Sequence, residues 1–294
     1  MKLIYINGFW PGFTEETDGV HFGFFKNILT AVFETEICIT TDMGRADILL
    51  ETFFQSSLLF RKQWACSIFF SAEGTLAIPN HIQNYSYIIG TLPNKDIIAS
   101  LGLRYISCPL YITYEYCKPT SYTIPITIPP KSICSIISSE AFQTRINERI
   151  QFLEYLTSQH ISIDFGGSYR NNIGFKVQGH YFEQPILEFQ KQYRIVCALE
   201  NCCIDDYITE KVINPLRAGT IPLYLGSDKI GSYINEQRII KVDTNNFNGC
   251  LEEIHKLLTD DAYWLKKVNE PLFIKPITAI IEDIIIAMKK LLKF

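Results

Sequence analysis

The sequence predicts an α/β protein built from two Rossmann-like domains that face each other across a cleft. Short apolar runs of strand length alternate with segments of helical periodicity along most of the chain. This alternation predicts parallel sheets with right-handed crossover connections. A proline-rich stretch without helical periodicity, residues 118–131, interrupts the pattern near the middle and predicts a domain boundary. We expect residues 1–128 and 129–274 to form the two domains, and residues 275–294 to form a helix that packs back on the first.

In the first half, one helix is predicted because apolar residues recur at helical spacing over residues 22–33. The predicted strands cover residues 2–6, 36–40, 47–52, 66–71, 87–90 and 104–107. The segment from Cys108 to Tyr111 is predicted to leave the sheet.

In the second half, strands are predicted over residues 132–138, 161–165, 195–199, 221–225 and 239–242. Predicted helices cover residues 140–156, a segment opening at Asp206, and residues 250–258, 260–269 and 277–292. Pro215 lies within the segment that opens at Asp206 and is expected to kink or shorten that helix.

Composition excludes several classes of protein. A formal net charge of -4 argues against a nucleic-acid binder that relies on electrostatic attraction. The nine cysteines show no CxxC spacing, which indicates reduced thiols rather than a disulfide framework or a zinc site. No uncharged apolar stretch is long enough to span a membrane. We therefore expect a soluble cytoplasmic protein or one peripheral to a membrane. The Ile- and Asn-rich composition suggests an AT-rich genome, bacterial or viral, and in the viral case we expect the host cytoplasm.

The stretch from Tyr193 to Gly226 concentrates polar residues between two buried strands. The first strand ends at Glu200 and Asn201, and Tyr207, Glu210 and Lys211 fall on one face of the following helix. Ligands bind at the carboxyl ends of strands in such sheets, and a helix N-terminus favours anions. Lys211 could meet phosphate there and Glu210 could accept hydroxyl hydrogens. Ordinary capping by Asp206 with a solvated Lys211 explains the residues equally well.

Three other features could contribute to a site. Arg145, in a predicted helix after the strand that ends at Ser138, is of the type that binds phosphate in a bidentate manner. The polar turn 166–172 contains Arg170 and Asn171 and reads either as an anion loop or as a surface loop. Glu73 follows a predicted strand and is the candidate general base. No Asp-x-Asp, GxSxG, HExxH or GxGxxG pattern is present.

Three ordered stretches resemble the α1,3/α1,4-fucosyltransferase family. ALENCCIDDYITEKVINPLRAGTIPLYLGS resembles its donor-site signature, SSEAFQTRINERIQFLEYL its strand and helix with a phosphate-binding arginine, and GGSYRNNIG a loop of the bacterial members. FFSAEG is similar, more loosely, to the catalytic segment of the family. The sequence departs from the family at Leu199, Gly74 and Pro215.

The resemblance implies an enzyme with the GT-B fold, which periodicity alone leaves as one option among several. It implies inverting transfer of fucose from GDP-fucose to a hydroxyl of a GlcNAc-type glycan acceptor, with the acceptor on the N-terminal domain. By this resemblance the catalytic residues are Glu73, as the base, and Lys211. The implied donor-binding residues are Arg145, Ser138, Glu200, Asn201, Tyr207, Thr209, Glu210, Lys211, Arg170 and Asn171.

We expect no required cofactor and no metal site, because no Asp-x-Asp pattern is present. Stimulation by Mn²⁺ or Mg²⁺ stays open, although no such pattern indicates it. Two alternatives stay open. The chain could transfer the sugar of another nucleotide sugar, or it could be a non-catalytic module that binds sugar nucleotides or glycans. The retained Glu73 favours an enzyme, because a binding module needs no base.

Overall fold

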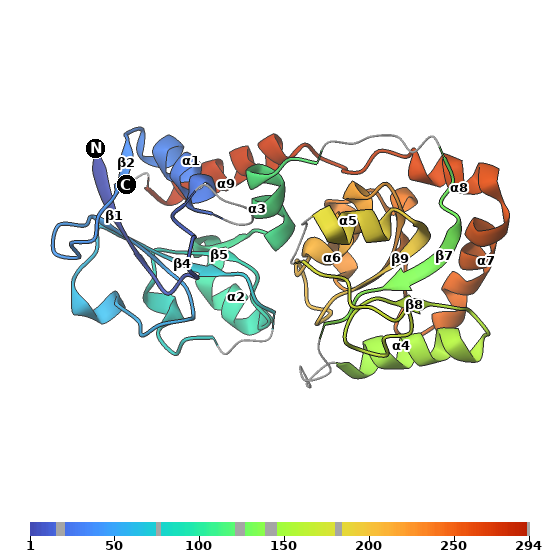
Figure 1. Cartoon of the computed structure of the whole chain (residues 1–294). Coiled ribbons are helices and arrows are strands. Elements are labelled where there is room, and N and C mark those ends of the chain that lie inside the picture. Colours follow the sequence, from blue (N-terminus) through green and yellow to red (C-terminus); the bar gives the residue numbers. More distant parts are fainter. Residues whose placement is uncertain (16–20, 75–77, 121–126, 139–145, 180–183, 293–294) are drawn as a thin grey trace. The chain divides into compact units, whose positions relative to one another are not determined.

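The computed structural model describes residues 1–15, 21–74, 78–120, 127–138, 146–179 and 184–292. The chain forms two compact units, each with its own parallel sheet (Figure 1). Unit 1 comprises Met1–Pro119, Ile204–Asp206 and Lys275–Phe294. Unit 2 comprises Thr120–Cys203 and Tyr207–Ile274.

Unit 1 contains a six-stranded sheet in the order β2-β1-β3-β4-β5-β6, with every described pair of neighbours parallel. Its strands are β1 (Lys2–Asn7), β2 (Ile37–Ile39), β3 (Ile48–Glu51), β4 (Cys66–Ser71), β5 (Tyr87–Gly90) and β6 (Tyr105–Ser107). Its helices are α1 (Phe22–Phe33), α2 (Lys95–Leu101), α3 (Leu110–Cys117) and α9 (Ile277–Leu292). The central strands β3, β4 and β5 are buried throughout, which explains why their sequences are mostly apolar rather than alternating.

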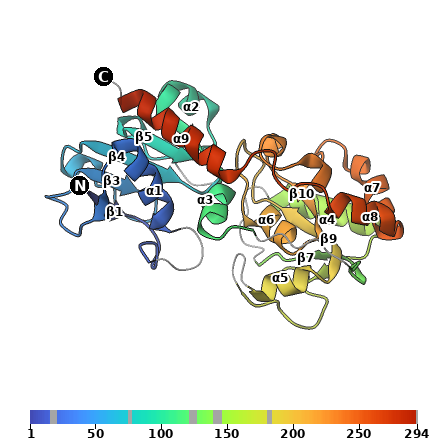
Figure 2. The same cartoon turned by 90° about the horizontal axis from the view of Figure 1, so that it is seen from above.

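The last helix of the chain belongs to unit 1. Figure 2 shows α9 beside α1, although about 250 residues separate them in the sequence, and both helices contact α3. The Tyr87 hydroxyl donates a hydrogen bond of 3.0 Å to the Met288 carbonyl, and Lys289 lies 2.7 Å from the Glu34 carboxylate. These contacts attach the end of the chain to the sheet of unit 1.

Unit 2 contains a five-stranded parallel sheet in the order β11-β10-β9-β7-β8. Its strands are β7 (Lys131–Ser135), β8 (Asp164–Phe165), β9 (Tyr193–Leu199), β10 (Ile221–Leu225) and β11 (Ile240–Lys241). Its helices are α4 (Ile146–Ser158), α5 (Gln184–Gln190), α6 (Glu210–Arg217), α7 (Leu251–Thr259) and α8 (Asp261–Val268). The two sheets share a strand order. Unit 1 reads β2-β1-β3-β4 from one edge, and unit 2 reads β8-β7-β9-β10 from the β8 edge, so in each sheet the strand that comes second in the sequence lies outside the first.

The segment from Cys108 leaves the sheet as expected, and α3 begins at Leu110, directly after Pro109. An expectation about another helix is wrong. The helix expected to open at Asp206 begins at Glu210 instead, with Thr209 as its N-cap. Asp206 has a left-handed backbone with φ of 61°, and it is held in unit 1 by a 2.7 Å hydrogen bond from the Ser107 hydroxyl to its carboxylate. A left-handed residue cannot continue a right-handed helix, so the helix starts after it.

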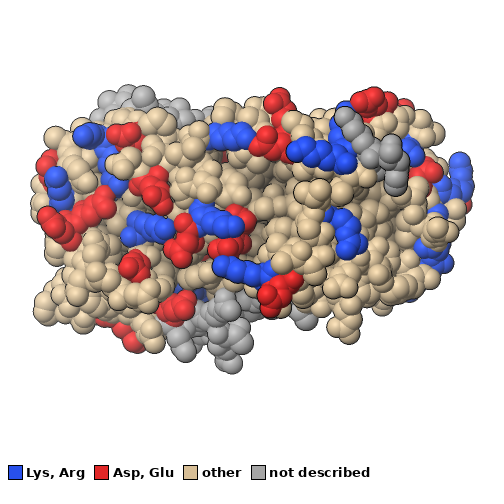
Figure 3. Space-filling model, turned by 180° about the vertical axis from the view of Figure 1, so that it is seen from behind, with Lys and Arg blue, Asp and Glu red and all other residues tan. Residues whose placement is uncertain are grey.

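Over the described residues, no helix combines the length and the apolar character that crossing a membrane requires. On the face that Figure 3 shows, Lys and Arg residues lie among Asp and Glu residues, and the part of that face which the structure describes presents no broad basic surface.

Candidate functional site

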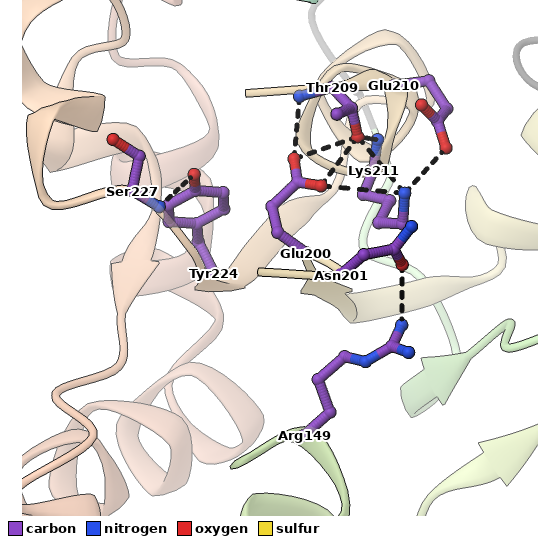
Figure 4. Close-up of polar contacts among 8 residues, drawn as sticks. All are labelled: Arg149, Glu200, Asn201, Thr209, Glu210, Lys211, Tyr224 and Ser227. Atoms are coloured by element: carbon purple, nitrogen blue, oxygen red, sulfur yellow. Dashed lines mark hydrogen bonds and ion pairs between the residues drawn. The ribbon is translucent and has the colours of Figure 1, made fainter. Parts of the chain in front are cut away.

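A cluster of polar side chains lies at the carboxyl end of β9. Glu200 and Asn201 directly follow this strand, and Thr209, Glu210 and Lys211 form the beginning of α6 (Figure 4). The connections from β7 and β9 leave toward opposite sides of the sheet, since β8 lies beyond β7 and β10 lies beyond β9. Such a reversal of strand order is where open α/β sheets bind their ligands.

Glu200 is 1% exposed and orders the start of α6. Its Oε1 accepts hydrogen bonds from the Thr209 backbone N–H (2.7 Å) and hydroxyl (3.0 Å), and its Oε2 lies 2.8 Å from the same hydroxyl. Burial raises the pKa of this carboxyl to about 7, against the opposing influence of Lys211 and of the Thr209 hydrogen bonds. Both oxygens are therefore occupied by α6, and Glu200 supports the site from within.

Close packing around Glu200 requires a glycine on the neighbouring strand end. A Cβ atom on Gly226 would lie 2.4 Å from the Tyr224 hydroxyl and 2.7 Å from Glu200 Cγ. The Tyr224 hydroxyl in turn accepts the Ser227 N–H at 2.9 Å, which fixes the turn beside the buried carboxylate.

Lys211 is the cation of the cluster, and its side chain is 25% exposed. Its Nζ lies 3.1 Å from Glu210 Oε1 and 3.6 Å from Glu200 Oε2. Burial alone would lower the pKa of Lys211, but the two carboxylates together raise it above its usual range. The side chain therefore carries a positive charge at neutral pH at the N-terminus of α6, where backbone N–H groups also favour an anion.

A second cation, Arg149, reaches the cluster from α4 and is 6% exposed. Its Nη1 donates to Asn201 Oδ1 at 3.1 Å, while its Nε has no hydrogen-bond partner among the described residues. Burial lowers its pKa, and the nearby Glu200 counteracts that effect. A guanidinium remains charged under these conditions and presents donors in a planar fork.

Sequence reasoning named Arg145 rather than Arg149. Arg145 lies outside the described residues, so its role stays a prediction. The signal for Arg149 was its place in the apolar stripe of α4, because it precedes the fully buried Phe152, Leu153 and Leu156 at helical spacing. A charged residue inside a buried stripe needs a partner or a ligand.

The other predicted donor residues differ in their surroundings. Tyr207 is buried beside the cluster, and Ser138 is exposed three residues beyond β7. Arg170 pairs with Glu154 at 2.9 Å, and the Asn171 amide donates to the Gly167 and Phe175 carbonyls. These contacts order the loop after β8, and the structure does not bring Arg170 or Asn171 to Lys211. Their part in donor binding stays a prediction.

The candidate base is in unit 1. Glu73 is half-buried and lies two residues beyond the carboxyl end of β4, as the sequence indicates. It thus belongs to a different unit from Lys211 and Arg149. Over the described residues, no group of three or more His, Cys, Asp or Glu side chains is arranged to hold a metal ion.

Comparison with known proteins assigns the C-terminal half. The sequence profile of glycosyltransferase family 10 (fucosyltransferase), C-terminal domain, matches residues 128–267. This range contains β7–β11 and the whole polar cluster described above, called the cation cluster from here on: Arg149, Glu200, Asn201, Thr209, Glu210 and Lys211. This segment therefore resembles the C-terminal domain of that family. The chain is 34% identical over 142 residues to a putative fucosyltransferase of Acanthamoeba polyphaga mimivirus, which is 46% of this chain and 24% of that protein. It is 32% identical over 106 residues to an α-(1,3)-fucosyltransferase of Helicobacter pylori, 36% of this chain and 21% of that protein.

The chain spans about a quarter of the length of these relatives. The similarity in fold extends further. The crystal structure of an α1,3-fucosyltransferase with GDP superimposes with a TM-score of 0.70 at 20% identity, over 100% of this chain and 90% of that one. The predicted GT-B fold with two Rossmann-like domains is confirmed, and so is the predicted family resemblance.

Proposed function

We propose that this chain transfers fucose from GDP-fucose to a hydroxyl of a GlcNAc-type glycan, with inversion at the anomeric carbon. The observation that carries the proposal is the pair of cations, Arg149 and Lys211, at the strand reversal of a domain that resembles family 10. One crystallised α1,3-fucosyltransferase of similar fold holds GDP-fucose, which supports this choice of donor.

The pyrophosphate of the donor is the group that the two cations would bind. Arg149 has an unpartnered Nε and a planar fork that suits two phosphate oxygens. Lys211 adds a point charge where the backbone N–H groups of α6 point outward. As the bond from C1 of fucose to phosphate breaks, negative charge grows on GDP, and both cations stabilise it.

Hydroxyl groups of the donor would meet the remaining polar groups of the cluster. Glu210 and Asn201 each contact one of the cations, so they hold that cation in place and can bind ribose or fucose hydroxyls at the same time. Tyr207 would line the pocket. Arg145, Ser138, Arg170 and Asn171 remain proposed contacts of the same donor.

Glu73 would act as the general base. The acceptor oxygen attacks C1 of fucose, its proton passes to the Glu73 carboxylate, and GDP departs from the opposite face. Another carboxylate at this edge of the unit 1 sheet, Glu51, is 1% exposed and accepts hydrogen bonds from Asn7, Leu58 and Tyr85. A carboxylate held in this way cannot reach a substrate hydroxyl, which leaves Glu73 as the better candidate.

We further propose that no metal is needed, because Arg149 and Lys211 supply the positive charge that a cation would bring to the leaving group. We also propose a reducing compartment, the cytoplasm. All nine cysteines are free thiols, among them the adjacent Cys202 and Cys203.

Isothermal titration with GDP-fucose, GDP-mannose and UDP-sugars tests the donor. We expect Arg149→Ala and Lys211→Ala each to weaken GDP-fucose binding about ten- to hundredfold, since a hydrogen bond to a charged group is worth ~1.5–3 kcal/mol. Lys191→Ala is the matched control, because Lys191 is exposed on unit 2 and pairs with Glu188. Selective binding of a UDP-sugar, or unchanged affinity in both cation variants, would contradict the proposal.

A further inference from the structure

The shared strand order of the two sheets identifies a second ligand-binding position, in unit 1. The connections from β1 and β3 diverge, because β2 lies on one side of β1 and β3 followed by β4 lies on the other. This is the same reversal that β7 and β9 make in unit 2, where the cation cluster lies. Open parallel sheets bind ligands outside the carboxyl ends of strands at such a reversal.

The floor of this position is a closed polar network. Asn7 ends β1 and Glu51 ends β3, and both side chains are buried. The Asn7 amide donates to Glu51 Oε1 at 2.6 Å and to the Ser56 carbonyl at 3.0 Å, and the Tyr85 hydroxyl donates to Glu51 Oε2. These groups hydrogen-bond to one another, so the floor offers a ligand no free carboxylate oxygen.

The rim of this position is aromatic. Phe9 and Trp10 follow β1 and are partly exposed, and Phe54 follows β3 with 56% of its surface exposed. The two loops are joined at Gly8, whose carbonyl accepts the Phe54 N–H at 3.3 Å. Gly8 has φ of +78°, and a Cβ atom there would lie 2.5 Å from the Thr52 carbonyl oxygen, so only glycine permits this approach.

Trp10 packs against two aromatic rings and stays partly exposed. Its ring packs at 5.4 Å on the buried Phe13 in an edge-to-face arrangement, and at 5.6 Å on Phe9. Phe9 in turn lies parallel to Phe70 of β4, which precedes Glu73 by three residues. None of the described hydrogen bonds uses the Trp10 indole N–H, which can therefore donate to a ligand.

The charge at this position differs from that of the cation cluster. The described residues after the two strands, 8–15 and 52–58, include one charged side chain, the exposed Glu15. A nucleotide diphosphate would find no cation among them. A neutral ligand with one apolar face and several hydroxyl groups fits better, and a pyranose ring in an oligosaccharide has these properties.

Distance along the sheet relates this position to the candidate base. β1 and β4 are separated by β3 alone, so their ends lie about 10 Å apart at ~4.8 Å for each strand spacing. The Thr52 hydroxyl, which donates to the Phe70 carbonyl at 2.8 Å, ties the loop after β3 to β4. A ring stacked on Trp10 would thus neighbour the ring whose hydroxyl meets Glu73.

We propose that Trp10, supported by Phe9 and flanked by Phe54, is the platform on which one ring of a neutral oligosaccharide acceptor stacks, next to the ring that accepts the transferred sugar. The proposal rests on the proposed function, because it assigns the acceptor of that reaction. Trp10 binds the acceptor and takes no part in proton transfer.

Saturation-transfer NMR on the full chain with GDP present tests the platform directly, with N-acetyllactosamine and chitobiose as neutral disaccharide probes. We expect Trp10→Ala to raise the dissociation constant of the better probe about tenfold, the scale of losing one aromatic contact together with its buried area. Trp10→Phe should restore part of the affinity. Leu103→Ala is the control, because Leu103 is 70% exposed beside the opposite end of the same sheet. Thermal melting of each variant confirms folding.

The outcomes separate this proposal from the proposed function. Loss of disaccharide binding in Trp10→Ala with unchanged GDP-fucose affinity supports the platform. Unchanged disaccharide binding in folded Trp10→Ala, or a wild-type chain that binds neither neutral probe, overturns it. If the disaccharide binds through Trp10 but GDP-fucose does not bind to the wild type, the donor assignment fails while the platform stands.

Discussion

Replacing Glu200 by glutamine is expected to remove a specific pH dependence of the stability of unit 2. The buried carboxyl has its pKa raised from 4.5 to about 7 because burial disfavours the charged form. Between these two pH values the folded unit binds more protons than the unfolded chain, so its unfolding free energy falls as pH rises. The stability that unit 2 gains from keeping Glu200 protonated is therefore complete below pH 4.5 and lost above about pH 7.

The magnitude follows from the two pKa values. At ~1.4 kcal/mol for each pH unit between them, ionising Glu200 in the folded state costs about 3 kcal/mol. Glutamine keeps an oxygen that can accept the Thr209 N–H but has no proton to lose. Relative to wild type, Glu200→Gln should therefore gain about 3 kcal/mol between pH 4.5 and pH 7.5, on top of a constant offset from exchanging the neutral carboxyl for an amide. The attraction of Lys211 for the ionised carboxylate is already included in the pKa of about 7.

Urea unfolding at a series of pH values measures this difference. Trp264 is fully buried in α8, so a background with Trp10 and Trp64 replaced by phenylalanine reports on unit 2 by fluorescence. Glu154→Gln is the matched control, because the Glu154 side chain is 55% exposed and its carboxylate meets water in both states. A difference between Glu200→Gln and wild type that stays constant with pH would refute the reasoning. If the wild type instead becomes more stable relative to the variant as pH rises, the attraction of Lys211 outweighs burial in setting the pKa of Glu200.

Three further predictions concern the reaction and unit 1. Glu73→Gln should lower kcat about 10²- to 10⁴-fold without changing the GDP-fucose dissociation constant, as measured by GDP release and titration, and full activity would exclude Glu73 as the base. Tyr85→Phe should lower the unfolding free energy of unit 1 by about 1–3 kcal/mol, because Glu51 then loses a buried donor; an unchanged urea midpoint would contradict this role. EDTA should leave the rate of GDP release unchanged, and a loss that Mn²⁺ or Mg²⁺ restores would contradict the metal-free proposal.

The sequence predicts most of the sheet strands because parallel strands are buried on both faces. β4, β5 and β10 have the predicted bounds, since each is an apolar run that begins and ends with the strand. α3 has no such signal. Residues 111–115 are all buried, so the helix lacks the polar face that helical periodicity requires.

The cation cluster was predictable only where it is local in sequence. Glu200, Asn201 and Lys211 come from one strand-loop-helix segment, so their proximity follows from the segment alone. Arg149 comes from another helix, and its direction depends on which face of α4 packs on the sheet. The role of Glu200 could not be predicted either, because its hydrogen bonds depend on the residue at which α6 begins. The left-handed Asp206 cannot belong to the helix, and α6 begins at Glu210.

The same hydrogen bonds explain why the base should come from unit 1 even though a carboxyl with a suitable pKa lies in unit 2. With a pKa of about 7, Glu200 would be poised for proton transfer at neutral pH. Its oxygens, however, are taken by Thr209 and Lys211, and Glu210 is likewise bound to Lys211 (Figure 4). Protonating either carboxylate would release the cation that, in the proposed reaction, stabilises the departing GDP. We therefore propose that proton transfer and leaving-group stabilisation are supplied by separate units, with Glu73 performing the first and Lys211 the second.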